Sequence, residues 1–190
     1  LTGLREPERT ALRTPLATGF WREYNEWRDK VTVAQRQKRI GDILLLTEEI
    51  QNPLIKEEAI GEAGRALSDM GRNELALAQY RKGLEVNSGN LNFRRQEAFN
   101  LNRMGRVDDA IVKIESLLND FPNDSEAIAY LGRIYKEMWA DSWKNITDKN
   151  KRMKYAFDSY HWLIRAIDIY LRGFHMDLNN NYPGINALTF

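Results

Sequence analysis

Apolar side chains recur at intervals of three and four residues through most of the chain, which is the spacing of one face of an α-helix. Ile128, Leu131 and Tyr135 follow this spacing in a helix that we expect from 125 to about 144. A second run, from about 151 to about 176, keeps the spacing in Tyr155, Ser159, Leu163, Ala166, Ile167, Tyr170 and Phe174. The pattern predicts an all-α fold.

The middle of the chain repeats itself with a period of about 34 residues, a length typical of a two-helix unit. The segment 57–90 aligns with the segment 91–124 without a gap. The paired positions are Gly64 with Ala98, Leu67 with Leu101, Gly71 with Gly105, Arg72 with Arg106, Ala76 with Ala110 and Tyr80 with Ile114. A period of this kind with a central glycine indicates a unit of two helices that stacks on its neighbours.

These two copies resemble tetratricopeptide repeats, which place a small residue, an aliphatic residue and a glycine at these positions, and Pro122 matches the closing turn. The sequence departs from the repeat at Gly83 and Leu117, where the second helix usually carries alanine, and at Ser88, where a closing proline is common. The resemblance implies a tetratricopeptide-like α-α superhelix, a right-handed solenoid.

The third repeat, 125–180, is longer than the other two. Its Gly132 is in register, but the alanine of its second helix is Ala166, whereas the register of the other repeats places it at position 144. The difference of about 22 residues is two sets of 11, and 11 residues make about three helical turns. We therefore expect an insertion at about 137–158 that lengthens both helices equally into a projecting arm, with its turn at 145–151.

The flanks lie outside the repeat pattern. Residues 1–18 look irregular. Residues 19–55 predict two helices that do not match the repeat, because Asp42 and not alanine stands one repeat length before Ala76. We expect these two helices to cap the open end of the solenoid. Pro183 is typical of the first turn of a helix, so we expect a further, truncated helix from 183. The chain does not begin with methionine, so we interpret it as a piece of a longer protein.

The last third resembles a narrower family. It is similar to the central regulatory region, the TRAFs-binding domain, of the apoptosis signal-regulating kinase family and its bacterial relatives. The matching residues are Gly132, Arg133, Ile134, Tyr135, Lys136, Ala166, Ile167, Tyr170, Arg172, Gly173, Phe174, and Tyr182 to Ala187. This resemblance implies an all-helical repeat region that regulates a neighbouring effector domain through protein contacts, and it leaves the arm unexplained.

Composition narrows the choice of partner and compartment. Lys and Arg number 28 against 27 Asp and Glu, so we expect neither a nucleic-acid nor a membrane partner. The chain has no cysteine, which excludes disulfides and thiolate chemistry and suits a reducing compartment. No apolar run approaches the length that crosses a bilayer. We expect a cytoplasmic protein.

No group of residues predicts catalysis. His161 and His175 lie about 14 residues apart on one expected helix, about 21 Å along its axis, and cannot share a metal. The sequence has no glycine-rich loop and no His-Arg-Asp or Asp-Phe-Gly triplet of a kinase. We expect no enzyme, no metal and no cofactor.

The first helices of tetratricopeptide repeats line a concave groove that binds extended peptides. The residues that map to this groove are Arg65, Asn92, Arg95, Gln96, Phe99, Asn102, Arg103, Tyr130, Arg133 and Lys136. Arginine binds carboxylates in a bidentate manner, so this basic floor suits an acidic protein or peptide. The alternative is an ordinary solvated surface neutralised by Glu58, Glu62 and Glu126.

The expected arm carries Trp139, Trp143 and Trp162. So much aromatic surface needs a cover. One interpretation is that the N-terminal helices cover it, and the other is a partner-binding or self-association surface.

Together these patterns predict a non-catalytic protein–protein interaction scaffold that regulates a larger signalling or stress-response protein. The alternative is a self-assembly module in which the aromatic arm joins copies into homo-oligomers.

Overall fold

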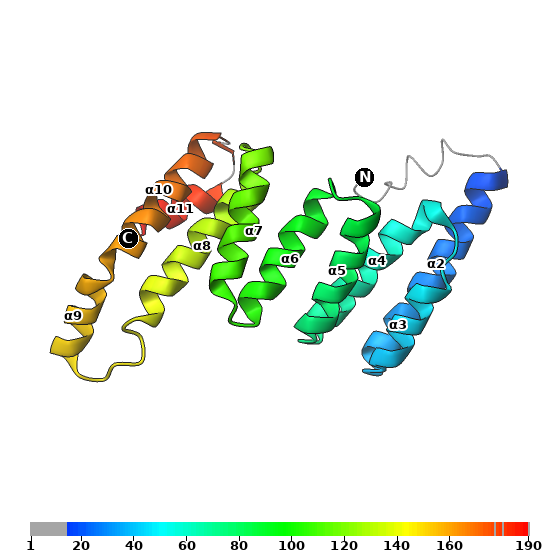
Figure 1. The fold of residues 1–190 in the computed structure, drawn as a ribbon, viewed down its shortest axis with the longest axis horizontal. Helices are drawn as coiled ribbons and strands as arrows, with labels where there is room; N and C mark the ends of the chain where they lie inside the picture. Colours follow the sequence, from blue (N-terminus) through cyan, green and yellow to red (C-terminus); the bar gives the residue numbers. More distant parts are fainter. Residues whose placement is uncertain (1–14, 177, 180, 190) are drawn as a thin grey trace. The chain divides into compact units, whose positions relative to one another are not determined.

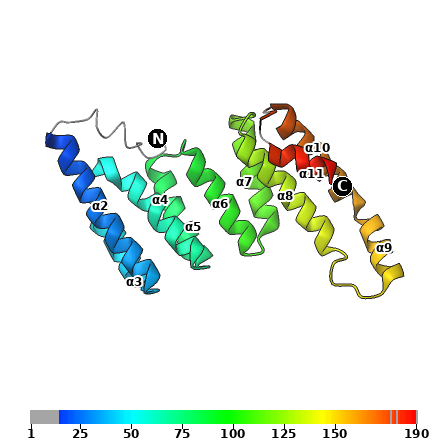
Figure 2. The ribbon, with the colours of Figure 1, turned by 180° about the vertical axis from the view of Figure 1, so that it is seen from behind.

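The computed structural model describes residues 15–176, 178–179 and 181–189 and divides the chain into two compact units, 1–104 and 105–190. Figures 1 and 2 show helices throughout the described residues, which confirms the predicted all-α class. The first unit contains α2 (Pro15–Arg36), α3 (Ile40–Glu49), α4 (Pro53–Asp69), α5 (Asn73–Val86) and α6 (Leu91–Arg103). The second contains α7 (Val107–Asp120), α8 (Ser125–Asp141), α9 (Lys149–Asp158), α10 (Tyr160–Met176) and α11 (Asn181–Leu188).

The turns between paired helices share one backbone conformation. Gly71 and Gly105 have φ of 72° and 77°, the left-handed region that glycine adopts without strain. After the first of these turns the amide of Arg72 donates to the carbonyl oxygen of Leu67 at 2.8 Å and closes the end of α4. The predicted glycines are therefore helix-ending residues.

The turn between α2 and α3 repeats this geometry without a glycine. Lys38 has φ of 56°, and the amide of Arg39 donates to the carbonyl oxygen of Ala34 at 2.8 Å. Lys38 lies one position nearer to Gly71 than a full repeat length would place it. The expectation that the N-terminal helices do not match the repeat is therefore wrong for this turn, since α2 and α3 form a helical pair of the same kind.

The N-terminal helices α2 and α3 each bury one face within the first unit. Tyr24 and Trp27 of α2 are each 5% exposed and stack with a centroid distance of 6.0 Å. The indole Nε1 of Trp27 donates to the carbonyl oxygen of Leu46 in α3 at 2.8 Å. Tyr24 and Trp27 thus belong to the core of the first unit, with Trp21 packed against it.

Close helix packing depends on small residues. A Cβ added to Gly64 would lie 2.7 Å from the ring of Tyr80, and one added to Gly132 would lie 2.9 Å from the ring of Tyr170. Between successive pairs, a Cβ added to Gly83 would overlap the ring of Phe93. The unusual glycine at 83 is explained by this aromatic ring, which fills the space of the customary alanine.

The arm differs from the expected pair of continuous helices. Its first helix, α8, ends at Asp141, and the returning half of the hairpin is divided into α9 and α10 by a break at Ser159. The hydroxyl of Ser159 donates to the carbonyl oxygen of Tyr155 at 2.7 Å, and side-chain hydrogen bonds of this kind bend helices. The predicted uninterrupted helix from about 151 to 176 is therefore wrong at this residue. In Figure 1, α9 diverges from α8 toward the arm's tip.

The first and the last described helix also begin earlier than the sequence predicts. The helix α2 begins at Pro15, so the last part of the segment expected to be irregular, 1–18, is helical. Proline is favoured in the first turn because its missing N–H has no helical partner there. Residues 1–14 lie outside the described residues. At the other end, α11 begins at Asn181, two residues before the predicted start at 183.

Candidate functional site

The predicted groove residues of the first unit lie on α4 and α6. Arg103 of α6 lies 4.2 Å above the ring of Phe99, and its Nη1 donates to Oγ of Ser68 in α4 at 2.9 Å. The hydroxyl of Ser68 in turn donates to the side-chain amide oxygen of the buried Asn100 at 3.1 Å. These contacts hold the guanidinium of Arg103 in place between the two helices.

Arg65 and Arg103 approach the same tyrosine. Burial raises the pKa of Tyr80 to about 12, and both arginines act on it electrostatically in the opposite direction. Arg65 also pairs with Glu62 at 3.1 Å and remains largely exposed. Glu62 thus partly neutralises Arg65, as the alternative of an ordinary solvated surface predicts. Arg103 is instead held by hydrogen bonds to Ser68 and by the ring of Phe99.

Acidic groups lie beside this basic pair. Burial, and then the neighbouring carboxylate of Glu62, raises the pKa of Glu58 above its ordinary value. The same two glutamates, after burial, raise the pKa of Tyr24 in α2. The first-helix surface of this unit is therefore mixed in charge, not uniformly basic.

The other predicted groove residues of α6 are Asn92, Arg95, Gln96, Phe99 and Asn102. Nε of Arg95 donates to the carbonyl oxygen of Leu91 in its own helix at 3.3 Å. Four of these side chains are half-buried, namely Arg95, Gln96, Phe99 and Asn102. Asn92 is exposed.

The second unit brings Tyr130, Arg133 and Lys136 together on α8. Nε of Arg133 donates to Glu137 at 2.7 Å, a hydrogen bond that raises the pKa of Arg133. Nζ of Lys136 donates to Oδ1 of Asn186 in α11 at 2.9 Å. This bond places α11 next to α8, and Asn186 was not among the predicted site residues.

Tyr170 of α10 packs behind this surface, against Gly132 of α8. Its side chain is fully buried, and its hydroxyl has no hydrogen-bond partner among the described residues. The rings of Tyr170 and Tyr182 meet edge to face with centroids 6.2 Å apart. Burial and the neighbouring Tyr182 raise the pKa of Tyr170, while Arg133 acts to lower it. The hydroxyl of Tyr182 is close enough to act on this pKa as a hydrogen-bonding neighbour but does not meet the geometry of a hydrogen bond to Tyr170, so a buried donor without a well-formed acceptor lies near Arg133.

The three tryptophans of the arm pack chiefly within the arm. Trp139 lies 5.1 Å from Trp143 and donates from Nε1 to the carbonyl oxygen of Ala156 in α9 at 3.0 Å. Trp162 stacks on Tyr135 of α8 at 5.7 Å. All three tryptophans are half-buried. The arm itself thus supplies part of the cover that its aromatic surface needs.

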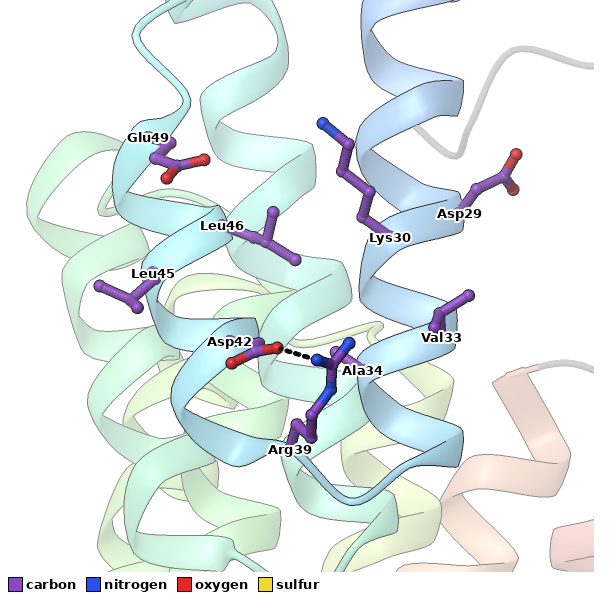
Figure 3. A pocket seen from close by; sticks show the side chains of 9 residues that line it. All are labelled: Asp29, Lys30, Val33, Ala34, Arg39, Asp42, Leu45, Leu46 and Glu49. Atoms are coloured by element: carbon purple, nitrogen blue, oxygen red, sulfur yellow. Dashed lines mark ion pairs between the residues drawn. The ribbon is translucent and has the colours of Figure 1, made fainter.

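A cavity of about 500 Å³ opens between α2 and α3 in the first unit. Its lining includes Val33, Leu45 and Leu46, and Arg39 and Asp42 form a 3.1 Å ion pair at its edge (Figure 3). None of the predicted site residues lines it. The cavity is therefore separate from the surface that the repeat pattern identified.

The described residues contain no cluster of three or more acidic or histidine side chains placed to hold a metal ion. Within the same residues no helix is long and apolar enough to span a membrane.

Comparison with known proteins identifies the repeat. The family described as Tetratricopeptide Repeats-Sensor matches residues 72–190, more than half of the chain. No curated protein matches the chain in sequence.

Several solved structures share the fold at low sequence identity. A tetratricopeptide repeat protein from Parabacteroides merdae has a TM-score of 0.59 and 15% identity, over 87% of this chain and 57% of that one. A thermophilic tetratricopeptide protein from Thermus thermophilus has a TM-score of 0.54 and 15% identity, over 69% of this chain and 62% of that one. MamA from Desulfovibrio magneticus RS-1 has a TM-score of 0.53 and 14% identity, over 88% of each chain. The chain thus spans less than two thirds of the first and second of these, and the likeness concerns the fold.

Proposed function

The chain belongs to the Tetratricopeptide Repeats-Sensor family, and from this premise we propose that it is a non-catalytic interaction domain that binds an acidic protein segment through its first helices. Tetratricopeptide folds typically serve as scaffolds for protein contacts. The description of the family as a sensor supports a regulatory role in a larger signalling or stress-response protein. The resemblance of the last third to the regulatory region of the apoptosis signal-regulating kinases supports the same role. A cytoplasmic location accords with the absence of cysteine.

The unsatisfied hydroxyl of Tyr170 carries the proposal. A buried donor without an acceptor costs about 1–3 kcal/mol, and an incoming carboxylate would remove that cost. Arg133 uses Nε for Glu137, and its guanidinium carries further donors on the terminal nitrogens. Because Tyr170 is fully buried, a carboxylate held by Arg133 would reach its hydroxyl only when the covering side chains move aside, and it would then gain two charge-assisted hydrogen bonds. An acidic side chain, or a chain's own carboxyl end, has this chemistry.

A peptide-display selection tests the proposal. The wild-type chain should enrich peptides that carry Asp or Glu, and Arg133→Glu should weaken the best of them by at least about tenfold, the value of one hydrogen bond to a charged group. Arg95→Glu and Arg103→Glu test the first unit in the same way. Lys149→Glu, an equal charge reversal on the exposed start of α9, is the matched control and should leave binding unchanged.

Two results would contradict the proposal. One is an enriched set without acidic residues, and the other is equal affinity for the wild type and all three arginine variants.

Self-assembly through the arm is the second candidate function. The observation that favours it is the exposure of large apolar side chains along the outer side of α9 and α10, including Phe157 at 74% and Tyr160 at 52%. These residues differ from the three tryptophans that the sequence pattern singled out.

A further inference from the structure

The outer side of the arm carries a line of exposed apolar residues, which we name the arm stripe. Its members, with their exposed fractions, are Met153 (62%), Phe157 (74%), Tyr160 (52%), Ile164 (44%) and Leu171 (39%). The intervals are four, three, four and seven positions, which is the spacing of the contact positions of a helix that pairs with another helix. From Met153 to Leu171 the stripe is about 27 Å long at about 1.5 Å per residue.

The stripe is continuous across the break at Ser159. The rings of Phe157 in α9 and Tyr160 in α10 stack with centroids 5.9 Å apart and an interplanar angle of 17°. The two helices therefore present their apolar residues on the same side. The tryptophans lie on the other side of the returning helices, where Trp162 stacks on Tyr135 of α8.

The apolar character of α10 is specific to this repeat. With Ala166 aligned to Ala76 and Ala110, Ile164 corresponds to Glu74 and Asp108. In the same alignment Leu171 corresponds to Arg81 and Glu115. The other second helices thus carry charge at the positions where α10 presents Ile164 and Leu171 to solvent, so the stripe does not arise from the repeat pattern itself.

The stripe is also symmetric about its centre. Met153 and Leu171 lie nine positions on either side of Trp162, and Tyr160 and Ile164 lie two positions on either side. When a second copy of the helix runs in the opposite direction, each large residue of one copy meets a large residue of the other. Half-buried Ile167 would then lie opposite Phe157. Such a surface is self-complementary, as a two-fold interface requires.

The charges beside the stripe follow nearly the same symmetry. Lys154 follows Met153 and Asp168 follows Ile167, and the two charged residues lie seven positions on either side of His161. Both side chains are exposed, and neither forms an ion pair within the described residues. In an antiparallel pair Lys154 of each copy would face Asp168 of the other, giving two reciprocal ion pairs. A different amphipathic helix has no reason to match this arrangement.

We propose that the arm stripe is the surface through which two copies of this chain pair, with their α9–α10 segments antiparallel and Lys154 of each facing Asp168 of the other. Burial of the five stripe residues supplies the free energy of association, and the ion pairs fix the direction and register. This surface is separate from the first-helix surface, so pairing and the binding of an acidic segment can hold or fail independently.

Sedimentation equilibrium of the whole chain tests the proposal. The wild type should show a monomer–dimer equilibrium, and Phe157→Glu should shift the chain to monomer. Because Phe157 is mostly exposed, this substitution leaves the fold of the monomer intact, which circular dichroism checks. Val112→Glu, on an apolar residue of α7 that is 63% exposed, is the matched control and should leave the dimer unchanged.

A charge swap tests the register. Lys154→Asp or Asp168→Lys alone places like charges opposite one another at two symmetric places and should weaken dimerisation by about tenfold. The double variant Lys154→Asp with Asp168→Lys should restore the wild-type affinity. A chain that remains monomeric up to millimolar concentration, a dimer that survives Phe157→Glu, or a swap that restores nothing would each overturn the proposal.

Discussion

The ring of Tyr170 rests on Gly132 as the ring of Tyr80 rests on Gly64. The two glycines are separated by two repeat lengths, whereas the two tyrosines are separated by two repeat lengths and the whole insertion. The arm therefore enters and leaves the repeat without changing how its two helices meet. This is the physical basis for treating α8 and α10 as an ordinary repeat with an appendage.

A first prediction concerns this contact. Gly132→Ala should destabilise the chain by about 1–3 kcal/mol, because the new methyl group would lie 2.9–3.1 Å from ring carbons of a fully buried tyrosine. Gly41→Ala in α3 is the control, since nothing lies within 4 Å of the added Cβ there. The control should be neutral or stabilising by up to about 1 kcal/mol through helix propensity. Urea denaturation midpoints measure both, and equal effects would refute the packing argument.

A second prediction concerns the left-handed turns. Lys38→Gly should stabilise the chain by about 1 kcal/mol, because φ of 56° is strained for lysine and relaxed for glycine. Gly71→Ala should destabilise it by a similar amount, although nothing would touch the added methyl group. Thermal unfolding followed by circular dichroism compares the two. If both changes act in the same direction, backbone strain is not the cause.

A third prediction concerns pH. Burial and Glu62 raise the pKa of Glu58 in the folded chain, so its ionised form disfavours folding. The resulting loss of stability is absent below the ordinary glutamate pKa and complete above the raised one. Glu58→Gln should therefore stabilise the chain at pH 7, and the advantage should disappear as the pH falls below the ordinary glutamate pKa. Urea denaturation across this pH range measures the difference. A benefit that persists in acid would show that its origin is not ionisation.

A fourth prediction separates stability from recognition at Tyr170. Tyr170→Phe removes a buried hydroxyl that has no partner among the described residues, so the free energy of unfolding should stay the same or rise. The affinity for a selected acidic peptide should nevertheless fall, by about tenfold if the hydroxyl donates to a carboxylate. Isothermal titration and urea denaturation of the same preparation measure the two quantities. Unchanged affinity would remove Tyr170 from the proposed site.

The repeat positions of the sequence account for most of the core. Leu67, Ala76, Tyr80 and Leu101 are all essentially buried, because the small and large residues of a stacked helix pair must alternate in a fixed register. The sequence predicts the first helical pair but not its likeness to the repeat, for a local reason. Lys38 takes a backbone conformation that the sequence pattern assigns to glycine, and its spacing to the next turn is one position short.

The break in the arm could not be predicted from periodicity. Ser159 keeps the helical spacing of its neighbours, and only its hydrogen bonds to Tyr155 and Ser142 reveal the bend. Periodicity alone could not predict the arm stripe either. Tryptophan is the larger and more conspicuous side chain, whereas the exposure of Phe157 depends on which side of α9 faces α8.

The repeat spacing of the sequence could have predicted the positions of Asn186 and Tyr182. Position 181 follows position 125 by one repeat length and the insertion, so α11 begins where a fourth first helix belongs. Extending the repeat to this point places both residues beside α8. The identity of a partner has no comparable signal, because surface charge constrains the partner's chemistry and not its sequence.

Amide hydrogen exchange with a selected acidic peptide bound tests the central claim most directly. The proposed site predicts slower exchange on binding in α8 and α11 and around Tyr170 of α10, and unchanged exchange in α5, α7 and α9. Protection confined to the second helices or to the arm, with the first helices unaffected, would contradict it.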